Sequence, residues 1–207
     1  MNDGIRDKIK QAFELKKEER FEDALEILNT LHLNDSASNE IKKALIEVLF
    51  EYGSYLNDDW VEDFEKAVDC FTRIIELDAK NYRAWYNLGI SYFRLKQTKK
   101  SLEAYEQALK INPEYEYVFY NIGLVYEILN EDYESAAKYY EKALRLNESF
   151  TYALQALRDV RKKLELTELH KESNTAPTLE SQVICKECGN INRATAKYCD
   201  KCGNLIQ

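Results

Sequence analysis

Hydrophobic and small residues follow a fixed order in the segment from Tyr82 to Glu114, YRAWYNLGISYFRLKQTKKSLEAYEQALKINPE. Counted from Tyr82 as position 1, large residues stand at positions 4, 7 and 11 and small residues at positions 8, 20 and 27. The large residues fall on one face of a helix, and the small ones allow a second helix to approach it closely. Gly89, at position 8, should be the closest contact, because a glycine inside a helix costs about 1 kcal/mol relative to alanine. The segment therefore predicts two packed helices.

The same order returns from Glu116, with one additional residue. Its first helix repeats positions 4, 7, 8 and 11 with Phe119, Ile122, Gly123 and Tyr126. Its second helix runs one residue late, with Ala136, Tyr140 and Ala143. We therefore expect one inserted residue in the turn around NEDYE.

Two weaker copies precede these segments. A second helix is clear in FEKAVDCFTRIIELDA, and IKKALIEVLFEYGSYL fits as its first helix if Gly53 takes position 8. The turn NDDWVED is then two residues longer than usual, and Trp60 is placed in it to pack back onto the helix pair. The first copy shares only a few positions with the others: Ala12, Leu15, Phe21, Ala24 and Leu28.

These positions are the signature of the tetratricopeptide family, which residues 82–115 closely resemble. The resemblance implies an all-α fold, a right-handed solenoid of helix-turn-helix repeats over residues 1–170. Repeats are expected at about 5–38, 39–81, 82–115 and 116–150. A further helix over 151–170 becomes charged along its length, and we expect it to cap the open end of the array.

The resemblance also implies a protein or peptide partner, because in this family the first helix of each repeat lines a concave groove. Residues at positions 2, 5, 6, 9, 12 and 13 commonly contact an extended peptide there. In the third repeat these are Arg83, Tyr86, Asn87, Ile90, Phe93 and Arg94. In the fourth they are Tyr117, Tyr120, Asn121, Leu124, Glu127 and Ile128.

Asn87 and Asn121 share position 6, where an amide can both donate to and accept from a peptide unit. The alternative is that both are ordinary polar surface residues. Tyr86 and Tyr120 stand where a clamp for a chaperone's C-terminal carboxylate would have lysine, so we do not expect a receptor of that kind.

Fifteen tyrosines are distributed along the helical part and the tail. Those on packing positions are expected in the core: Tyr92, Tyr105, Tyr126 and Tyr140. Others are candidates to anchor a partner, since tyrosine combines a large apolar area with a polar tip: Tyr86, Tyr117, Tyr120 and Tyr152.

Four of the five cysteines lie in the last 23 residues, in two copies of C-x-x-C-G-N, with ten residues between Cys188 and Cys199. Paired C-x-x-C elements are typical of a zinc site, and a redox role would need a βαβ setting that the tail lacks. Gly189 and Gly203 allow the turn after each pair to take positive φ. We expect one structural Zn²⁺ held by Cys185, Cys188, Cys199 and Cys202.

This layout resembles the short zinc ribbons found at the ends of many prokaryotic proteins, so a small β zinc ribbon is expected over 183–207. About 25 residues cannot bury enough apolar surface to fold alone, so the metal should supply the folding free energy. Residues 171–182 are polar and without periodicity, which predicts a flexible linker.

The net charge and the available side-chain chemistry limit the possible functions. Residues 1–174 carry 25 Lys and Arg against 34 Asp and Glu, a net charge of −9. The remaining residues carry +1, which gives −8 for the whole chain. Nucleic acid is therefore a poor partner for the helical part, although the ribbon has a small basic excess. No apolar run is long enough for a membrane span, no signal peptide is visible, and no nucleophile–base pair, phosphate loop or open metal site appears. We expect a cytoplasmic, non-catalytic adaptor that binds a peptide or protein; the alternative is a nucleic-acid- or ribosome-associated factor acting through the ribbon.

Overall fold

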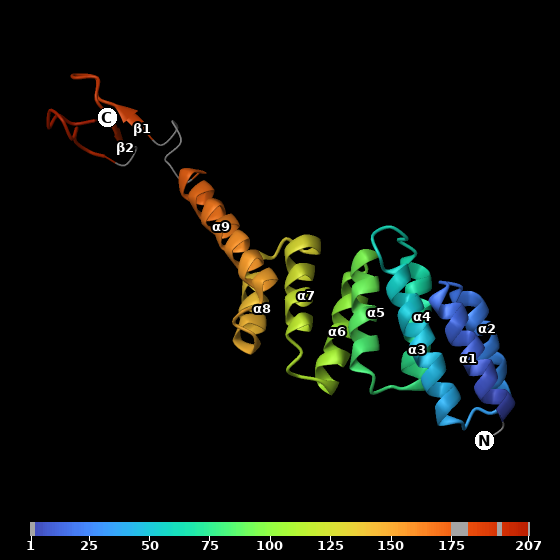
Figure 1. Ribbon diagram of the computed structural model, residues 1–207. Coiled ribbons are helices and arrows are strands. Elements are labelled where there is room, and N and C mark those ends of the chain that lie inside the picture. Colours follow the sequence, from blue (N-terminus) through green and yellow to red (C-terminus); the bar gives the residue numbers. More distant parts are fainter. Residues whose placement is uncertain (1–2, 175–181, 194–195, 207) are drawn as a thin grey trace. The chain divides into compact units, whose positions relative to one another are not determined.

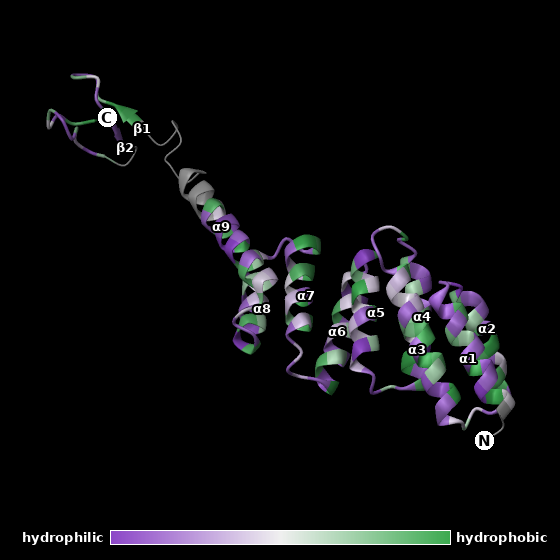
Figure 2. Ribbon diagram, viewed as in Figure 1, coloured by the Kyte–Doolittle hydropathy of each residue, from purple (hydrophilic) through white to green (hydrophobic). Residues whose placement is uncertain are grey.

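A computed structural model describes residues 3–174, 182–193 and 196–206 of the 207-residue chain. The chain divides into two compact units, Met1–Val160 and Arg161–Gln207 (Figure 1). Hydrophobic and hydrophilic residues share each helix of the first unit, as expected of amphipathic helices (Figure 2). In the described part of the chain, no helix is both long and apolar enough to cross a membrane.

The first unit consists of paired helices, which confirms the predicted fold class. The pairs are α1 (Asp3–Lys17) with α2 (Phe21–Asn34), α3 (Asn39–Leu56) with α4 (Phe64–Leu77), α5 (Tyr82–Arg94) with α6 (Thr98–Ile111), and α7 (Glu116–Leu124) with α8 (Tyr133–Leu146). A last helix, α9 (Thr151–Asn174), begins in the first unit and runs past the predicted end of the cap at residue 170. Of the predicted linker over 171–182, residues 175–181 lie outside the described residues.

The small positions of the repeats mark where paired helices touch. Gly89 is buried, and a Cβ atom built on it would lie 2.4 Å from Cε1 of Tyr105. Gly123 stands in the same relation to Tyr140, also at 2.4 Å. The buried hydroxyl of Ser101 donates to the carbonyl oxygen of Gly89 at 2.8 Å, which joins positions 20 and 8 across the pair. The expectation that Gly89 is a closest contact is confirmed.

The predicted core tyrosines are buried to different degrees. Tyr105 and Tyr140 are fully buried, whereas Tyr92 and Tyr126 are half-buried at the edge of the core. The two kinds of packing position therefore differ. Tyrosines of the second helices are enclosed in the helix pair, and tyrosines at position 11 of the first helices lie at the margin of the core.

The inserted residue of the fourth repeat lies in the first helix, not in the turn. Helix α7 passes directly into a π-helix, η1 (Val125–Leu129). Lys96 (φ 56°) and Glu131 (φ 53°) take the same left-handed conformation in the turns after α5 and η1. Lys96 lies four residues after Tyr92, but Glu131 lies five after Tyr126. The expected location around NEDYE was wrong, because a π turn absorbs one residue and leaves the following turn unchanged.

The longer turn between α3 and α4 contains Trp60, as predicted, but the side chain does not pack back onto the helices. It is 95% exposed. The turn is held instead by its polar residues: Asp58 accepts from the backbone N–H of Trp60 at 3.0 Å, and Asp59 pairs with Arg94 of the next repeat at 2.5 Å. The expectation of a packed Trp60 was wrong because these contacts fix the loop without it.

The described part of the second unit includes a two-stranded antiparallel sheet, β1 (Gln182–Ile184) with β2 (Ile191–Arg193). Ile184 is paired with Ile191 in the sheet, and an isolated bridge pairs Tyr198 with Leu205. This is the predicted small β element at the C-terminal end of the chain.

Candidate peptide groove and metal centre

A groove of about 790 Å³ runs along the first unit, and we call it the α3 groove. Most of its lining comes from one face of α3, where side chains three and four residues apart lie in line. Residues at the ends of α2, α4 and α5 complete it. The lining residues are Phe21, Lys43, Ile46, Glu47, Phe50, Glu51, Ser54, Asp78, Asn81 and Arg83.

The middle of the α3 groove is aromatic and its wall is acidic. The guanidinium of Arg83 lies over the ring of Phe50, 4.8 Å from its centroid. Lys16 of α1 reaches Glu47 at 2.8 Å and Glu51 at 2.9 Å. Partial burial acts to lower the pKa of Lys16, but the hydrogen bonds to both carboxylates outweigh it and raise the pKa above its usual value. The groove thus carries fixed charges of both signs beside an apolar surface.

Sequence reasoning missed this groove except for Arg83. Counting back from Gly53 as position 8 places Glu47, Phe50, Glu51 and Ser54 at positions 2, 5, 6 and 9, and all four line the groove. The signal was therefore present. The loose match of the second repeat and its longer turn drew attention to the third and fourth repeats instead.

The two predicted asparagines are placed differently. The Asn87 amide donates to the carbonyl oxygen of Arg83 at 2.8 Å. The Asn121 amide donates to the carbonyl oxygen of Tyr117 at 2.8 Å and to the hydroxyl of Tyr86 at 3.1 Å. Both N–H groups of Asn121 are thereby used within the first unit, so its carbonyl oxygen is the group left to meet a peptide N–H.

Other predicted groove residues contribute to packing or to the loops. Ile90 and Phe93 are half-buried against the core formed with Tyr105 and Val118. Leu124 is also half-buried. Arg94 pairs with Asp59 and stacks over Phe64, 4.7 Å from the ring centroid, so its guanidinium is held at the neighbouring turn. These contacts favour a structural role for Arg94.

Seven aromatic rings form a continuous series that we call the aromatic row. It crosses from the third repeat through the fourth to the start of α9, and neighbouring centroids along it are 5.0–6.4 Å apart. Its members are Tyr82, Tyr86, Tyr115, Tyr117, Phe150, Tyr120 and Tyr152. Tyr117 and Tyr152 are 43% and 68% exposed, so parts of the row face solvent. Tyr86, one of the tyrosines suggested as a partner anchor, is half-buried beside Tyr105 and Tyr115.

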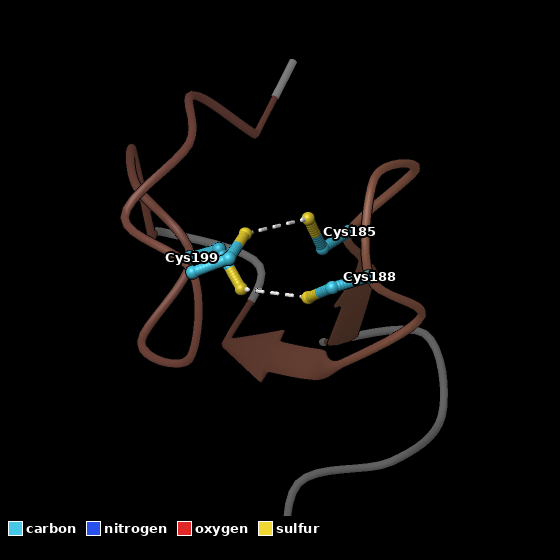
Figure 3. Close-up of side chains that lie close together, drawn as sticks. Cys185, Cys188 and Cys199 are labelled. Carbon is cyan, nitrogen blue, oxygen red and sulfur yellow. Dashed lines mark hydrogen bonds between the residues drawn. The ribbon is translucent and has the colours of Figure 1, made fainter.

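In the second unit the four terminal cysteines meet. Their sulfur atoms all lie within 4.8 Å of one another, and the two pairs face each other (Figure 3). The Cys185–Cys202 and Cys188–Cys199 sulfurs are each 3.6 Å apart. A tetrahedral ion with metal–sulfur bonds of about 2.3 Å separates its ligands by roughly 3.8 Å, so the four thiols fit a metal ion.

The two C-x-x-C turns have the same backbone structure. The N–H of Gly189 donates to the carbonyl oxygen of Cys185 at 2.9 Å, and the N–H of Gly203 donates to the carbonyl oxygen of Cys199 at 2.8 Å. Gly189 and Gly203 have φ values of 72° and 73°, as predicted from their place after each pair. Two equivalent turns thereby present their thiols to one point.

The thiols of this cluster influence one another's ionisation. Loss of water contact opposes ionisation of Cys199, but the N–H groups of Cys202 and Lys201 lower its pKa to about 6. At Cys202 the N–H of Asn204 acts in the same direction, yet loss of water contact and the neighbouring thiols raise its pKa to about 12. The first thiolate therefore makes the next ones unfavourable, and a bound cation would remove that repulsion.

Asn192, on β2, joins the sheet to the second cysteine turn. It is 4% exposed, donates to the carbonyl oxygen of Asn190 at 2.8 Å and accepts from the N–H of Asp200 at 3.0 Å. The cysteine spacing gave no signal for this contact, and sequence reasoning missed it.

The fifth cysteine, Cys70, lies apart from this cluster on α4. It is 5% exposed and belongs to the core of the first unit. Burial raises the pKa of its thiol to about 11, which makes it a poor nucleophile.

Two family models, each described as a tetratricopeptide repeat, match residues 82–115 and 117–150. The chain contains tetratricopeptide repeats. Anaphase-promoting complex subunit 3 of Schizosaccharomyces pombe is 30% identical over 92 residues, which cover 44% of this chain and 14% of that protein. Heat shock protein STI1 of Saccharomyces cerevisiae is 28% identical over 146 residues, 66% of this chain and 25% of that protein. The chain spans a quarter or less of the length of these relatives.

Solved tetratricopeptide structures share the fold. The first such domain of Spaghetti (RPAP3), bound to the HSP90 peptide SRMEEVD, has a TM-score of 0.53 and 26% identity, over 58% of this chain and 93% of that one. A double mutant of MamA RS-1 has a TM-score of 0.62 at 21% identity, over 84% and 93%, and this likeness bears on the fold alone. Tetratricopeptide domains such as that of RPAP3 bind peptides.

Proposed function

We propose that this chain is a non-catalytic adaptor that binds an extended segment of a partner protein along the first helices of its repeats. The observation that carries the proposal is that one helix, α5, borders both the α3 groove and the aromatic row. Its Arg83 lines the groove, and its Tyr86 belongs to the row and accepts from Asn121. A peptide lying there meets apolar surface and amide groups together, which is what recognition of an extended backbone requires.

The groove charges disfavour an acidic peptide of the kind bound by RPAP3. Glu47 and Glu51 stand at positions 2 and 6 of the second repeat, and Asp78 also lines the groove. Lys16 already pairs with both glutamates. The lining carboxylates outnumber the lining cations, Lys43 and Arg83, by one, so a chain of carboxylates is not the partner segment expected at this point.

The amides at position 6 provide the test. Replacing both Asn87 and Asn121 with alanine removes their hydrogen bonds to a bound backbone, and should weaken partner binding about tenfold, since each hydrogen bond contributes about 0.5–1.5 kcal/mol. The full-length wild type and double variant are compared by affinity capture from the native lysate, and captured proteins are then titrated individually.

Asn130 supplies the matched control, because it is an exposed asparagine outside the groove. Asn130→Ala should capture as wild type does. A photo-crosslinking residue at Tyr117, 43% exposed in the aromatic row, should label the partner, whereas one at Leu146, equally exposed on the second helix of the repeat, should not. Equal capture by wild type and the double variant would show that the groove is not the binding site.

For the second unit we propose one structural Zn²⁺ on Cys185, Cys188, Cys199 and Cys202, with the ribbon as a second protein contact. All four positions are filled by sulfur, which leaves none for water and suits a structural site. Such thiolates hold metal only while reduced, which supports a cytoplasmic location.

The surface of the ribbon favours a protein contact over nucleic acid. Two of its cross-strand pairs consist of large apolar residues that are each at least 57% exposed: Ile184 with Ile191, and Tyr198 with Leu205. Ile184 and Leu205 also border one hollow of about 150 Å³. The exposed lysines near them, Lys186 and Lys201, leave the alternative open to a direct test.

Ile184→Ser with Leu205→Ser should reduce capture of ribbon-dependent partners several-fold, because the exposed apolar area that binds them is lost. Lys186→Gln with Lys201→Gln should have little effect. Each variant is tested in the full-length chain for protein capture and for retention on single-stranded RNA at increasing salt. Salt-sensitive retention that disappears with the lysine pair would favour the nucleic-acid function instead.

A further inference from the structure

A second cavity, of about 510 Å³, lies between the fourth repeat and the first turns of α9. We call it the α9 pocket. Two tyrosine rings and two carboxylates border it, from Tyr120, Tyr152, Glu127 and Asp159. All four belong to the first unit, and neither carboxylate took part in the peptide site proposed above.

The π-helix contributes one of the carboxylates. Glu127 lies within η1, and its Oε2 accepts from the hydroxyl of the fully buried Tyr140 at 2.6 Å. This contact holds the glutamate at the wall of the pocket. Single π turns within α-helices are frequently found at functional sites, because the added residue turns a side chain out of the regular register.

The second carboxylate comes from α9. The amide of Gln155 donates to both oxygens of Asp159, each at 3.0 Å. Asp159 is exposed, and its donor is neutral, so this contact orients the carboxylate and leaves its charge in place. The field of Glu127 also reaches the rings: burial and then this glutamate raise the pKa of Tyr120.

The aromatic rings complete a setting suited to a cation. The centroids of Tyr120 and Tyr152 are 6.4 Å apart with planes tilted by 45°, and Tyr152 is 68% exposed. A cation within about 6 Å of a ring centroid is attracted by the negative face of the ring, and the attraction grows when carboxylates face it. A neutral apolar group would gain the ring contact but would gain no attraction from the negative charge of the carboxylates.

We propose that the α9 pocket binds a cationic side chain, lysine or arginine, of the partner segment. This inference rests on the proposed function and adds the chemistry of one anchor. The pocket ends the aromatic row through Tyr120 and Tyr152, so a segment that follows the row arrives at it. The net charge of −9 over residues 1–174 favours the approach of such a segment.

The test uses the full-length chain with ¹³C-labelled tyrosine rings and two small probes. N-acetyl-lysine N-methylamide carries the cation, and N-acetyl-norleucine N-methylamide is its neutral analogue. The lysine probe should shift the ring signals of Tyr120 and Tyr152 saturably, less so at high salt, and the norleucine probe should not. The signal of Tyr105 in the core should stay in place.

Glu127→Gln with Asp159→Asn should weaken binding of the lysine probe about fivefold to tenfold, the size of two ion pairs at a solvent-accessible site, while the ring contacts of Tyr120 and Tyr152 remain. Both changes keep the side-chain shape and the hydrogen-bond acceptor. Glu134→Gln removes an exposed charge outside the pocket and should bind as wild type does. Equal shifts from both probes, or unchanged lysine binding in the double variant, would overturn the proposal.

Capture experiments separate this inference from the proposed function. If partner capture depends on Asn87 and Asn121 but the lysine probe does not bind, the cation pocket is wrong and the adaptor stands. If the probe binds as expected but those two asparagines do not matter for capture, the pocket stands and the peptide groove is wrong.

Discussion

Replacing Gly89 with alanine is expected to destabilise the first unit by about 2–3 kcal/mol, the cost of overpacking a closely packed interface. Alanine is favoured over glycine in a helix by about 1 kcal/mol, so at an exposed helix position the same substitution would increase the free energy of unfolding. The clash decides the outcome, because the new Cβ would lie 2.4 Å from the ring of Tyr105, which is fully buried and cannot turn away. Urea unfolding followed by circular dichroism measures the difference.

Other helical glycines make this a graded series. Gly123→Ala should cost as much, since its Cβ would lie 2.4 Å from the ring of Tyr140. Gly53→Ala should cost less, with Phe71 at 2.9 Å, and Gly4→Ala should be neutral or slightly stabilising, with nothing within 4 Å. If Gly89→Ala unfolds at the same urea concentration as Gly4→Ala, the close approach of α5 and α6 is not what the glycine provides.

The repeat architecture was predictable because each position has a packing reason. Gly89 and Ser101 had to be small, since the structure places them in contact across the helix pair. The meeting of the four terminal cysteines was predictable from spacing alone, because two residues between thiols let both reach one point. In both cases short-range geometry repeats along the chain, so sequence offsets carry the information.

The local backbone conformations that accommodate inserted residues were not predictable. Spacing showed that the fourth repeat has one residue more, but a turn and a π-helix accommodate an insertion equally well in sequence terms. The conformation of η1 is decided by packing around it, including the contact of Glu127 with Tyr140. Trp60 was misplaced for a similar reason: apolarity suggests burial, but Asp58 and Asp59 hold the loop through polar contacts while the indole stays exposed.

The groove residues show a third limit. Arg94 stands at a position that often meets a peptide, yet the longer turn of the preceding repeat brings Asp59 within 2.5 Å of it. The position within the repeat fixes the backbone site of a side chain, but residues of the neighbouring repeat determine its contacts. The same turn obscured the match of α3, whose residues Phe50 and Glu51 line the largest groove described here.

Removing the metal is expected to unfold the cysteine ribbon completely and leave the helices intact. The described core of the ribbon consists of Cys185, Cys199 and Ile206, and two of these three belong to the proposed ligand set. Its other large apolar side chains are mostly exposed, so little hydrophobic stabilisation remains without the ion. Structural zinc in such modules contributes an apparent 10–16 kcal/mol, roughly, which is more than so small a unit can replace.

Amide signals in a ¹H–¹⁵N spectrum distinguish the two units. Addition of a chelator to the full-length chain should collapse the signals of β1, β2 and both cysteine turns to random-coil positions, and the helical circular dichroism signal should stay within a few per cent. Cys199→Ser should give the same spectrum without chelator and should lower the bound zinc from about one ion per chain to near zero, because serine is a poor ligand for this ion.

Cys70→Ala is the matched control, since it removes a cysteine of the core and leaves the terminal cluster untouched. It should keep its zinc and its ribbon signals. If the ribbon signals survive both chelation and Cys199→Ser, then the sheet and the hydrogen bonds of Asn192 suffice to hold the fold, and the metal is not its source of stability. A collapse confined to the ribbon would instead show that the ion folds this module alone, because the helices have a core of their own that contains no ligand cysteine.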